Sequence, residues 1–168
     1  EKAFASLPGA LARSGHAVTV FNRCRAPMTI EGADWRPWDV PRPAETDILV
    51  AFRKPELLAS VARAKRRFLW LTGDPGYLGH ARSRAFLDRW KPVLVFLSRS
   101  HVESHENADK LRSAILTPGL RPPFLAVEAN RPADPPRALV TAHPLHGLDW
   151  LLDLWRGTIH AIAPRAEL

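Results

Sequence analysis

The chain has 168 residues, of which 46% are hydrophobic and 24% charged, and its formal net charge is +7 at pH 7. This composition is that of a globular protein with one well-buried core, and no apolar stretch approaches the roughly 20 residues that cross a bilayer. We therefore expect neither membrane insertion nor secretion. The positive charge favours acidic partners, namely nucleic acid, an anionic membrane surface or phosphorylated ligands, without choosing among them. Cys24 is the single cysteine, so no internal disulfide can form, and we expect a cytoplasmic location with peripheral contact to the inner face of the membrane left open.

The first predicted element is a helix over residues 1–14, in which Leu7 and Leu11 share one face. Gly15 stands where such a helix ends with a positive φ. Pro8 predicts either a kink or a restart of the helix with the proline in its first turn. The chain begins without methionine on residues that already look helical, so we expect the fold to lack a first strand ahead of this helix.

Short apolar strands and amphipathic helices then alternate, which is the pattern of a parallel sheet. The β-branched run at 17–21 and the nearly continuous apolar run at 47–52 predict strands, and the second is typical of a strand buried on both faces. The remaining predicted elements are a helix over 55–62, a strand at 68–72, a helix at 81–90, a strand at 93–97, a helix at 100–108 and a strand at 114–117. We predict an α/β fold with a Rossmann-like, doubly wound parallel sheet and helices on both faces.

The amino-acid composition of the chain changes after this unit. Six prolines fall within residues 118–136, a density that excludes regular structure and predicts a semi-rigid linker. An apolar run at 138–142, a loop with two histidines and a helix from residue 148 then predict the start of a second α/β unit. The predicted organisation is a sheet domain at 1–117, a linker at 118–137 and a partial second unit at 138–168.

Ligands of open α/β sheets bind in the loops that follow the carboxyl ends of the strands. Arg53 follows a buried strand and could hold a phosphate or a carboxylate through paired hydrogen bonds, the alternative being a solvated loop arginine. The segment 72–79 has three glycines that let backbone approach a ligand, and Asp74 adds a carboxylate. Asp-Pro-Gly is also ordinary turn chemistry, so a simple turn is the alternative there. The loop at 98–101 follows the next strand.

A metal site and a charged surface are two further interpretations of polar clusters. His101 and His105, with Glu103 and Glu106, would share a helical face, but the spacing does not fit His-Glu-x-x-His and no third ligand is evident, so we expect no metal. Two basic clusters are predicted on or beside helices, either as a solvated face or as contacts for anionic lipid headgroups. They comprise Arg63, Lys65, Arg66 and Arg67, and Arg82, Arg84, Arg89 and Lys91.

The order of these segments resembles the group 1 glycosyltransferases, which have the GT-B fold of two Rossmann-like domains facing a cleft. Glu1 and the Gly-His-Ala-Val-Thr-Val of residues 15–20 are similar to a helix of that family and the strand after it. Pro118-Gly119 resembles the stretch that leads out of the N-terminal domain. The segment 139–168, with Gly-Leu-x-x-Leu-Leu and Pro-x-Ala-x-Leu, resembles the start of the donor-binding domain.

This resemblance implies that a sugar is transferred with retention, without a metal or other cofactor, from a nucleotide-sugar to a glycan or lipid-linked acceptor, as in bacterial polysaccharide biosynthesis. It implies acceptor-side candidates at Arg53, Asp74, Ser98, Ser100 and His101. It implies donor-phosphate candidates at His143, His146 and Gly147. It names no catalytic residue in this chain, and with it we expect no nucleic-acid partner.

The chain departs from the family pattern in two ways. The family places an arginine and a lysine around the first loop of the donor domain, whereas this loop offers histidines, which are largely neutral at neutral pH. The Gly-Gly loop expected ahead of Glu1 and the acidic pair expected beyond Leu168 are not in this sequence, so we expect the chain to be inactive alone. Two alternatives stay open: a non-catalytic basic α/β module that binds nucleic acid or membrane, and a nucleotide-sugar epimerase of GT-B fold.

Overall fold

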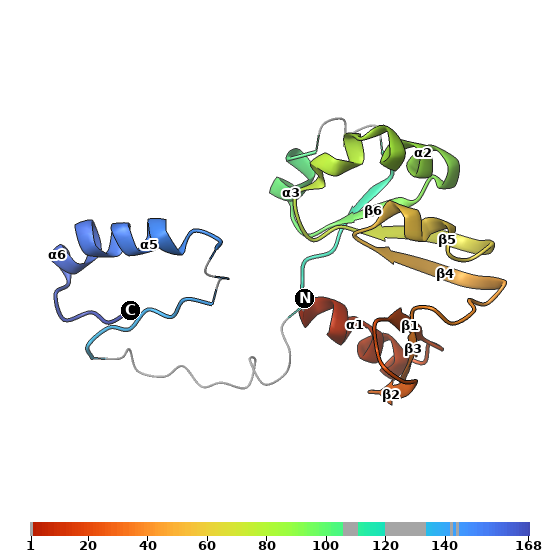
Figure 1. Ribbon diagram of the computed structural model, residues 1–168, viewed down its shortest axis with the longest axis horizontal. Helices are drawn as coiled ribbons and strands as arrows, with labels where there is room; N and C mark the ends of the chain where they lie inside the picture. The colour runs from red at the N-terminus through yellow and green to blue at the C-terminus, as the bar shows by residue number, and fades with distance from the viewer. Residues whose placement is uncertain (1, 106–110, 120–133, 142, 144) are drawn as a thin grey trace. The chain divides into compact units, whose positions relative to one another are not determined.

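The computed structural model describes residues 2–105, 111–119, 134–141, 143 and 145–168, with the side chains of residues 2–5 left aside. The chain divides into two compact units, residues 1–119 and 120–168 (Figure 1). Most of the predicted linker at 118–137 lies outside the described residues. In the part of the chain that the structure describes, no helix is both long and apolar enough to cross a membrane.

The first unit contains a four-stranded, all-parallel sheet flanked by helices, which confirms the predicted α/β, Rossmann-like fold. The strands are β4 (Glu45–Phe52), β5 (Arg63–Trp70), β6 (Val93–Phe96) and β7 (Ser113–Ile115), and they lie side by side in chain order. Because all four run in the same direction, their carboxyl ends meet at one edge of the sheet. The loops that leave this edge therefore follow one another in a row.

Short helices connect these strands. They are the 3₁₀ helix η1 (Pro55–Ala59), the 3₁₀ helix η2 (Pro75–Gly79), α2 (Ala81–Trp90) and α3 (Arg99–Glu103). Both 3₁₀ helices begin with a proline, whose fixed φ suits a first turn and whose missing N–H would have no partner there. Helix α2 is followed by its C-terminal cap Lys91, which takes the left-handed conformation with φ of 42°.

One hydrophobic cluster holds this sheet and its helices together. Leu69 and Phe96 contribute from strands β5 and β6, and both are 0% exposed. Leu58 of η1 and Leu78 of η2 pack into the same cluster. Full burial of such side chains stabilises the fold by about 1.5–3 kcal/mol each. The cluster thereby fixes the strand ends from which the loops project.

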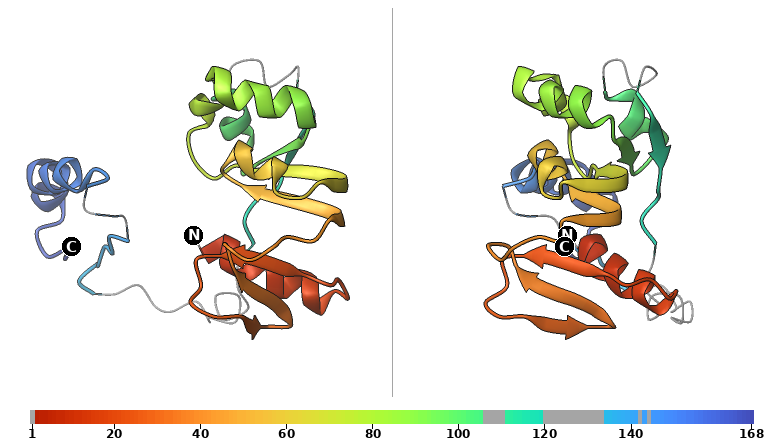
Figure 2. Two further views of the ribbon diagram at one scale, coloured as in Figure 1. Left: turned by 45° about the vertical axis from the view of Figure 1, so that its right-hand side comes forward. Right: turned by 90° about the vertical axis from the view of Figure 1, so that its right-hand side faces the viewer.

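A smaller sheet forms a separate layer of the first unit. Its strands are β1 (Thr19–Asn22), β2 (Met28–Ile30) and β3 (Ala33–Pro37), with β3 in the centre, parallel to β1 and antiparallel to β2. Val20, Ala33 and Trp35 form its own buried cluster, against which Ala12 packs. Figure 2 shows this small sheet, in red to orange, apart from the parallel sheet, whose colour runs from light orange in β4 to teal in β7.

Helix α1 (Lys2–Arg13) packs beside the small sheet. It is one continuous helix with Pro8 inside it, so the predicted restart at Pro8 is not found, while Gly15 follows the helix with the predicted positive φ, 89°. Gly9 lets the helix approach the turn before β3, because an added Cβ would lie 2.6 Å from the Cβ of Glu31. The Glu31 carboxylate in turn pairs with Arg13 at 2.6 Å.

Two strand predictions are wrong in their placement. The run at 17–21, expected in the parallel sheet, forms β1 of the small sheet, and β2 and β3 were not predicted because their short sequences lack a clear apolar alternation. Strand β5 begins at Arg63, five residues before the predicted start at residue 68. The cluster Arg63, Lys65, Arg66 and Arg67 therefore lies on a strand and not on a helix, because pairing with β4 overrides the poor β-propensity of charged residues.

Other elements differ in extent or exposure. The helix expected over 55–62 is a 3₁₀ helix that ends at residue 59, the helix expected over 100–108 ends at residue 103, and β7 covers 113–115. Residues 106–108 of the predicted helix lie outside the described residues. Ile48 and Val50 of β4 are 54% and 44% exposed, against the expected burial on both faces. These two residues lie two positions apart and so share one face of β4, the edge strand of its sheet, and this face is in contact with water.

The second unit is a helix with a short returning segment. Helix α5 (Leu148–Leu154), the π-helical turn η4 (Trp155–Ile159) and α6 (His160–Ile162) follow without a break, as the predicted apolar spacing requires. The predicted strand at 138–142 is wrong over its described residues 138–141. One isolated parallel bridge joins Arg137 to Glu167, whose side chains also pair at 2.7 Å. A lone bridge gives too few backbone hydrogen bonds to define a strand.

Candidate ligand site at the carboxyl ends of the parallel strands

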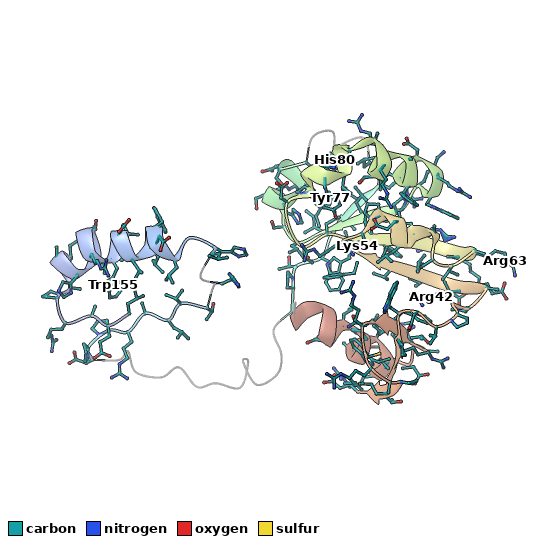
Figure 3. The ribbon with its side chains drawn as sticks, viewed as in Figure 1. Arg42, Lys54, Arg63, Tyr77, His80 and Trp155 are labelled. Atoms are coloured by element: carbon teal, nitrogen blue, oxygen red, sulfur yellow. The ribbon has the colours of Figure 1, made fainter. Side chains whose placement is uncertain are left out.

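The acceptor-side candidates lie in consecutive loops at one edge of the parallel sheet. Arg53 follows β4, Asp74 follows β5, and the segment 98–101 follows β6. Figure 3 labels Lys54 and Tyr77 at this end of the strands and Arg63 at the opposite end. The structure therefore places the three predicted loops along one edge, as the parallel order requires.

The loop after β4 is fixed by backbone contacts and by a strained residue. Arg53 has φ of 61°, a left-handed conformation that costs a non-glycine residue roughly 1–2 kcal/mol. Its N–H donates to the carbonyl of Trp70 at 2.9 Å, and the N–H of Lys54 donates to Phe52 at 2.8 Å. The chain therefore turns sharply at Arg53 and leaves its side chain exposed at the sheet edge.

Tyr77 fastens this turn to the next loop. Its phenol donates a hydrogen bond to the carbonyl oxygen of Arg53. Burial raises the pKa of Tyr77 above 10.0, although the positive charge of Arg53 opposes that change. The phenol consequently keeps its proton at neutral pH and remains a donor.

The glycine-rich loop after β5 makes ordinary turn contacts and also a close approach. An Asp74 carboxylate oxygen accepts from the N–H of Gly76 at 2.8 Å and so begins the helix η2. Gly73 lies beside the guanidinium of Arg53, since a Cβ on this glycine would be 4.0 Å from an Arg53 terminal nitrogen. The loop is therefore both a turn and a neighbour of Arg53.

His101 joins the loops after β5 and β6. Its Nδ1 accepts from the N–H of Leu97 at 3.2 Å, and its Nε2 lies 2.8 Å from the carbonyl oxygen of Gly73. Because a backbone N–H can only donate, Nδ1 carries no proton, and Nε2 must donate to Gly73. Both ring nitrogens are thus engaged within the protein, and the ring also packs edge-on against Phe96 at 5.2 Å. His101 is a positioning residue.

The serines complete the loop after β6. The Ser98 hydroxyl accepts from the N–H of His101 at 3.1 Å and caps helix α3, which starts at Arg99. The hydroxyls of Ser98 and Ser100 lie 2.9 Å apart. Ser100 is exposed, while Ser98 is partly buried. Ser100 therefore presents the hydroxyl that faces solvent.

Sequence reasoning missed Tyr77, which connects two of these loops. The available signal is that Tyr77 is the single tyrosine of the chain and stands in a glycine-rich segment after a buried strand. An amphipathic ring in such a segment is well suited to packing with its hydroxyl bonded to backbone.

The donor-phosphate candidates belong to the second unit. The rings of His143 and His146 lie 5.3 Å apart, and the N–H of His146 donates to the carbonyl of His143 at 2.8 Å. Gly147 precedes α5 with φ of 87°. All three residues are exposed. Their role in donor binding stays a prediction.

The described residues contain no group of three histidine, cysteine or acidic side chains that could hold a metal ion. Glu106, a member of the weighed zinc cluster, lies outside them.

Fold and site together define an α/β protein with a Rossmann-like sheet and with polar, arginine-containing loops at the carboxyl ends of its strands. Comparisons with protein-family models, with curated proteins and with solved structures give no match to this chain.

Proposed function

We propose that this chain is the acceptor-side domain of a GT-B glycosyltransferase together with the opening part of its donor-binding domain. The observation that supports the proposal most is the linkage of three consecutive strand-end loops by Tyr77 and His101. This linkage holds Arg53, Asp74 and Ser100 at one edge of a parallel sheet, the place where such sheets bind ligands.

The chemistry of these three side chains suits a glycan or a phosphate-linked glycan. A guanidinium binds phosphate through two parallel hydrogen bonds. A carboxylate accepts hydrogen bonds from sugar hydroxyls, and a serine hydroxyl can donate or accept. Asp74 uses one carboxylate oxygen in its turn, so its other oxygen would face the acceptor.

The donor part of the proposal rests on the family resemblance. In the complete enzyme, His143, His146 and Gly147 would approach the diphosphate of the nucleotide-sugar. Positive groups and backbone N–H groups there would stabilise the negative charge on the leaving nucleoside diphosphate.

The test is binding of acceptor-like ligands to the chain. Neutral oligosaccharides and sugar phosphates are titrated and followed by saturation-transfer NMR. We expect saturable binding that weakens about tenfold or more in Arg53→Gln, since a charge-assisted hydrogen bond is worth about 1.5–3 kcal/mol. Asp74→Asn keeps the turn because asparagine caps equally well. This variant should also weaken the binding of neutral oligosaccharides.

Arg84→Gln is the matched control, because Arg84 is an exposed cation on α2 outside this edge. Its binding should equal that of the wild-type chain. Absence of saturable glycan binding, or equal affinities of the Arg53 and Arg84 variants, would contradict the proposal.

A further inference from the structure

A groove of about 620 Å³ lies at the amino ends of the parallel strands, where Figure 3 labels Arg63. It is lined by the start of β5, the end of α2 and the residue before β7. This volume falls within the range of small-molecule sites, about 300–1,000 Å³. Its cationic lining residues are Arg63, Lys65, Arg66, Arg67, Lys91 and Arg112, and no described lining residue is acidic.

Two of these cations are already compensated. Arg63 pairs with Glu45 at 3.2 Å, and Lys65 pairs with Asp47 at 2.5 Å on the exposed surface. The hydrogen bond from Lys65 lowers the pKa of Asp47, which keeps that carboxylate charged. These two ion pairs join β4 to β5 and compensate the charges of Arg63 and Lys65. The uncompensated positive charge of the groove therefore comes from its other residues.

The exposed cations Arg66, Lys91 and Arg112 have no acidic partner among the described residues. They come from β5, from the residue after α2 and from the residue before β7. Three segments far apart in the sequence thus bring positive charge to one groove. Such a concentration of like charge is unfavourable in the empty protein and is relieved by an anion.

The buried member of the set is Arg67, which is 8% exposed. One terminal nitrogen donates to the carbonyls of Val61 and Ala62 at 3.0 and 3.1 Å, and the other, Nη1, is buried without a hydrogen-bond partner. The guanidinium lies over the Trp90 ring at 4.1 Å. Neutral carbonyls and a ring do not neutralise a buried charge, which normally requires an anion.

We propose that this groove binds a phosphate group. Arg66, Lys91 and Arg112, which line the groove together with the buried Arg67, supply the positive charges that its oxygens contact. Arginine suits this task because its planar fork matches phosphate geometry. Trp90 and Phe68 also line the groove and offer apolar surface to the organic part of the ligand. The site does not depend on the proposed glycosyltransferase activity, because it uses none of the residues at the carboxyl ends.

The first experiment titrates the chain with inorganic phosphate and with pyrophosphate at constant ionic strength, set by chloride. The indole N–H resonance of Trp90 is followed by proton–nitrogen NMR, since this nitrogen is buried without a partner beside Arg67. We expect a saturable shift with phosphate and pyrophosphate and none with chloride alone. Equal shifts with chloride would mean unspecific screening and would overturn the proposal.

The double variant R66Q/R112Q removes two groove cations, and R82Q/R84Q removes two exposed cations of α2 that do not line the groove. We expect the first to bind pyrophosphate at least about tenfold more weakly, the effect of losing one charge-assisted hydrogen bond. The second should bind like the wild type. Equal loss in both variants would overturn the proposal. Urea unfolding verifies that each is folded, and Arg112→Gln alone replaces the double variant if it is not.

A second arm identifies the source of the phosphate group. Co-sedimentation is measured with phosphatidylcholine vesicles with and without phosphatidic acid. Vesicle binding that requires Arg66 and Arg112 assigns the group to a lipid headgroup, while binding of soluble phosphate alone assigns it to a small molecule. If the binding of duplex DNA requires Arg66 and Arg112 but the binding of phosphate, pyrophosphate and vesicles does not, the groove is a nucleic-acid surface and the proposal fails.

Discussion

Replacing His101 by alanine should loosen the candidate site and destabilise the protein measurably. The substitution removes the hydrogen bond to Gly73 at 2.8 Å and the one from Leu97 at 3.2 Å. It also removes the edge-on contact with Phe96 at 5.2 Å. The bond to Gly73 connects two loops that are 28 residues apart in the sequence, and the other two interactions hold His101 against the end of β6 just before it.

The expected loss can be built from these contacts. A neutral hydrogen bond contributes about 0.5–1.5 kcal/mol net, and the bond to Gly73 counts at the lower end because it is exposed to water. An aromatic pair adds about 0.5–1.5 kcal/mol. We expect His101→Ala to lower the free energy of unfolding by about 2–3 kcal/mol.

Two isosteric variants divide this loss between the ring nitrogens. His101→Asn places an amide oxygen near the position of Nδ1, so it retains the bond from Leu97 and loses the bond to Gly73. His101→Gln places an amide nitrogen near the position of Nε2, so it retains the bond to Gly73 and loses the other. Each should recover part of the stability that alanine loses.

The assay is urea unfolding followed by tryptophan fluorescence. His80→Ala is the control, because His80 is exposed and its side chain makes no cap hydrogen bond to α2. It should stay within about 0.5 kcal/mol of the wild type. The reasoning is refuted if His101→Ala is equally mild, or if the asparagine and glutamine variants both match alanine.

Three further predictions concern single residues. Tyr77→Phe should lower the free energy of unfolding by about 1 kcal/mol. Because burial raises the folded-state pKa of Tyr77, the unfolding free energy of the wild type should also fall as pH rises above about 10. If urea unfolding at a series of pH values gives the same dependence on pH for both proteins, this prediction is contradicted. Leu58→Ala should lower the free energy of unfolding by about 2–5 kcal/mol in the same assay, because Leu58 is 0% exposed. Leu57→Ala, at a site that is 36% exposed, should cost much less, and similar losses of stability in the two variants would count against the assigned core. Ser98→Ala should cost about 1 kcal/mol and Ser98→Asn much less, so equal losses would show that the cap of α3 is unimportant.

The sequence predicted the parallel sheet well because its strands carry their own signal. Residues 48–52 and 93–96 are apolar and include β-branched side chains, and burial in a sheet is what such runs favour. It predicted the wrong start for β5 because Arg63 to Arg67 have no such signal. Their strand conformation comes from pairing with β4, a contact between segments that local reasoning does not see.

The candidate site was predictable only as a set of loops. Their positions follow from the rule that parallel strands share a carboxyl edge, which places Arg53, Asp74 and Ser98 without any knowledge of side chains. The links between the loops were not predictable, because the bond from His101 spans 28 residues and that from Tyr77 spans 24. Such bonds depend on the orientation of side chains after the sheet has formed.

The two hydrophobic clusters of the first unit have a consequence for how it opens. The small sheet depends on Val20, Ala33 and Trp35, and none of these belongs to the cluster of the parallel sheet. Elements with separate cores exchange their amide hydrogens as separate cooperative units. We therefore expect the amides of β1 and β3 to exchange through local openings that leave β5 and β6 protected, with the candidate loops in place while the small sheet opens.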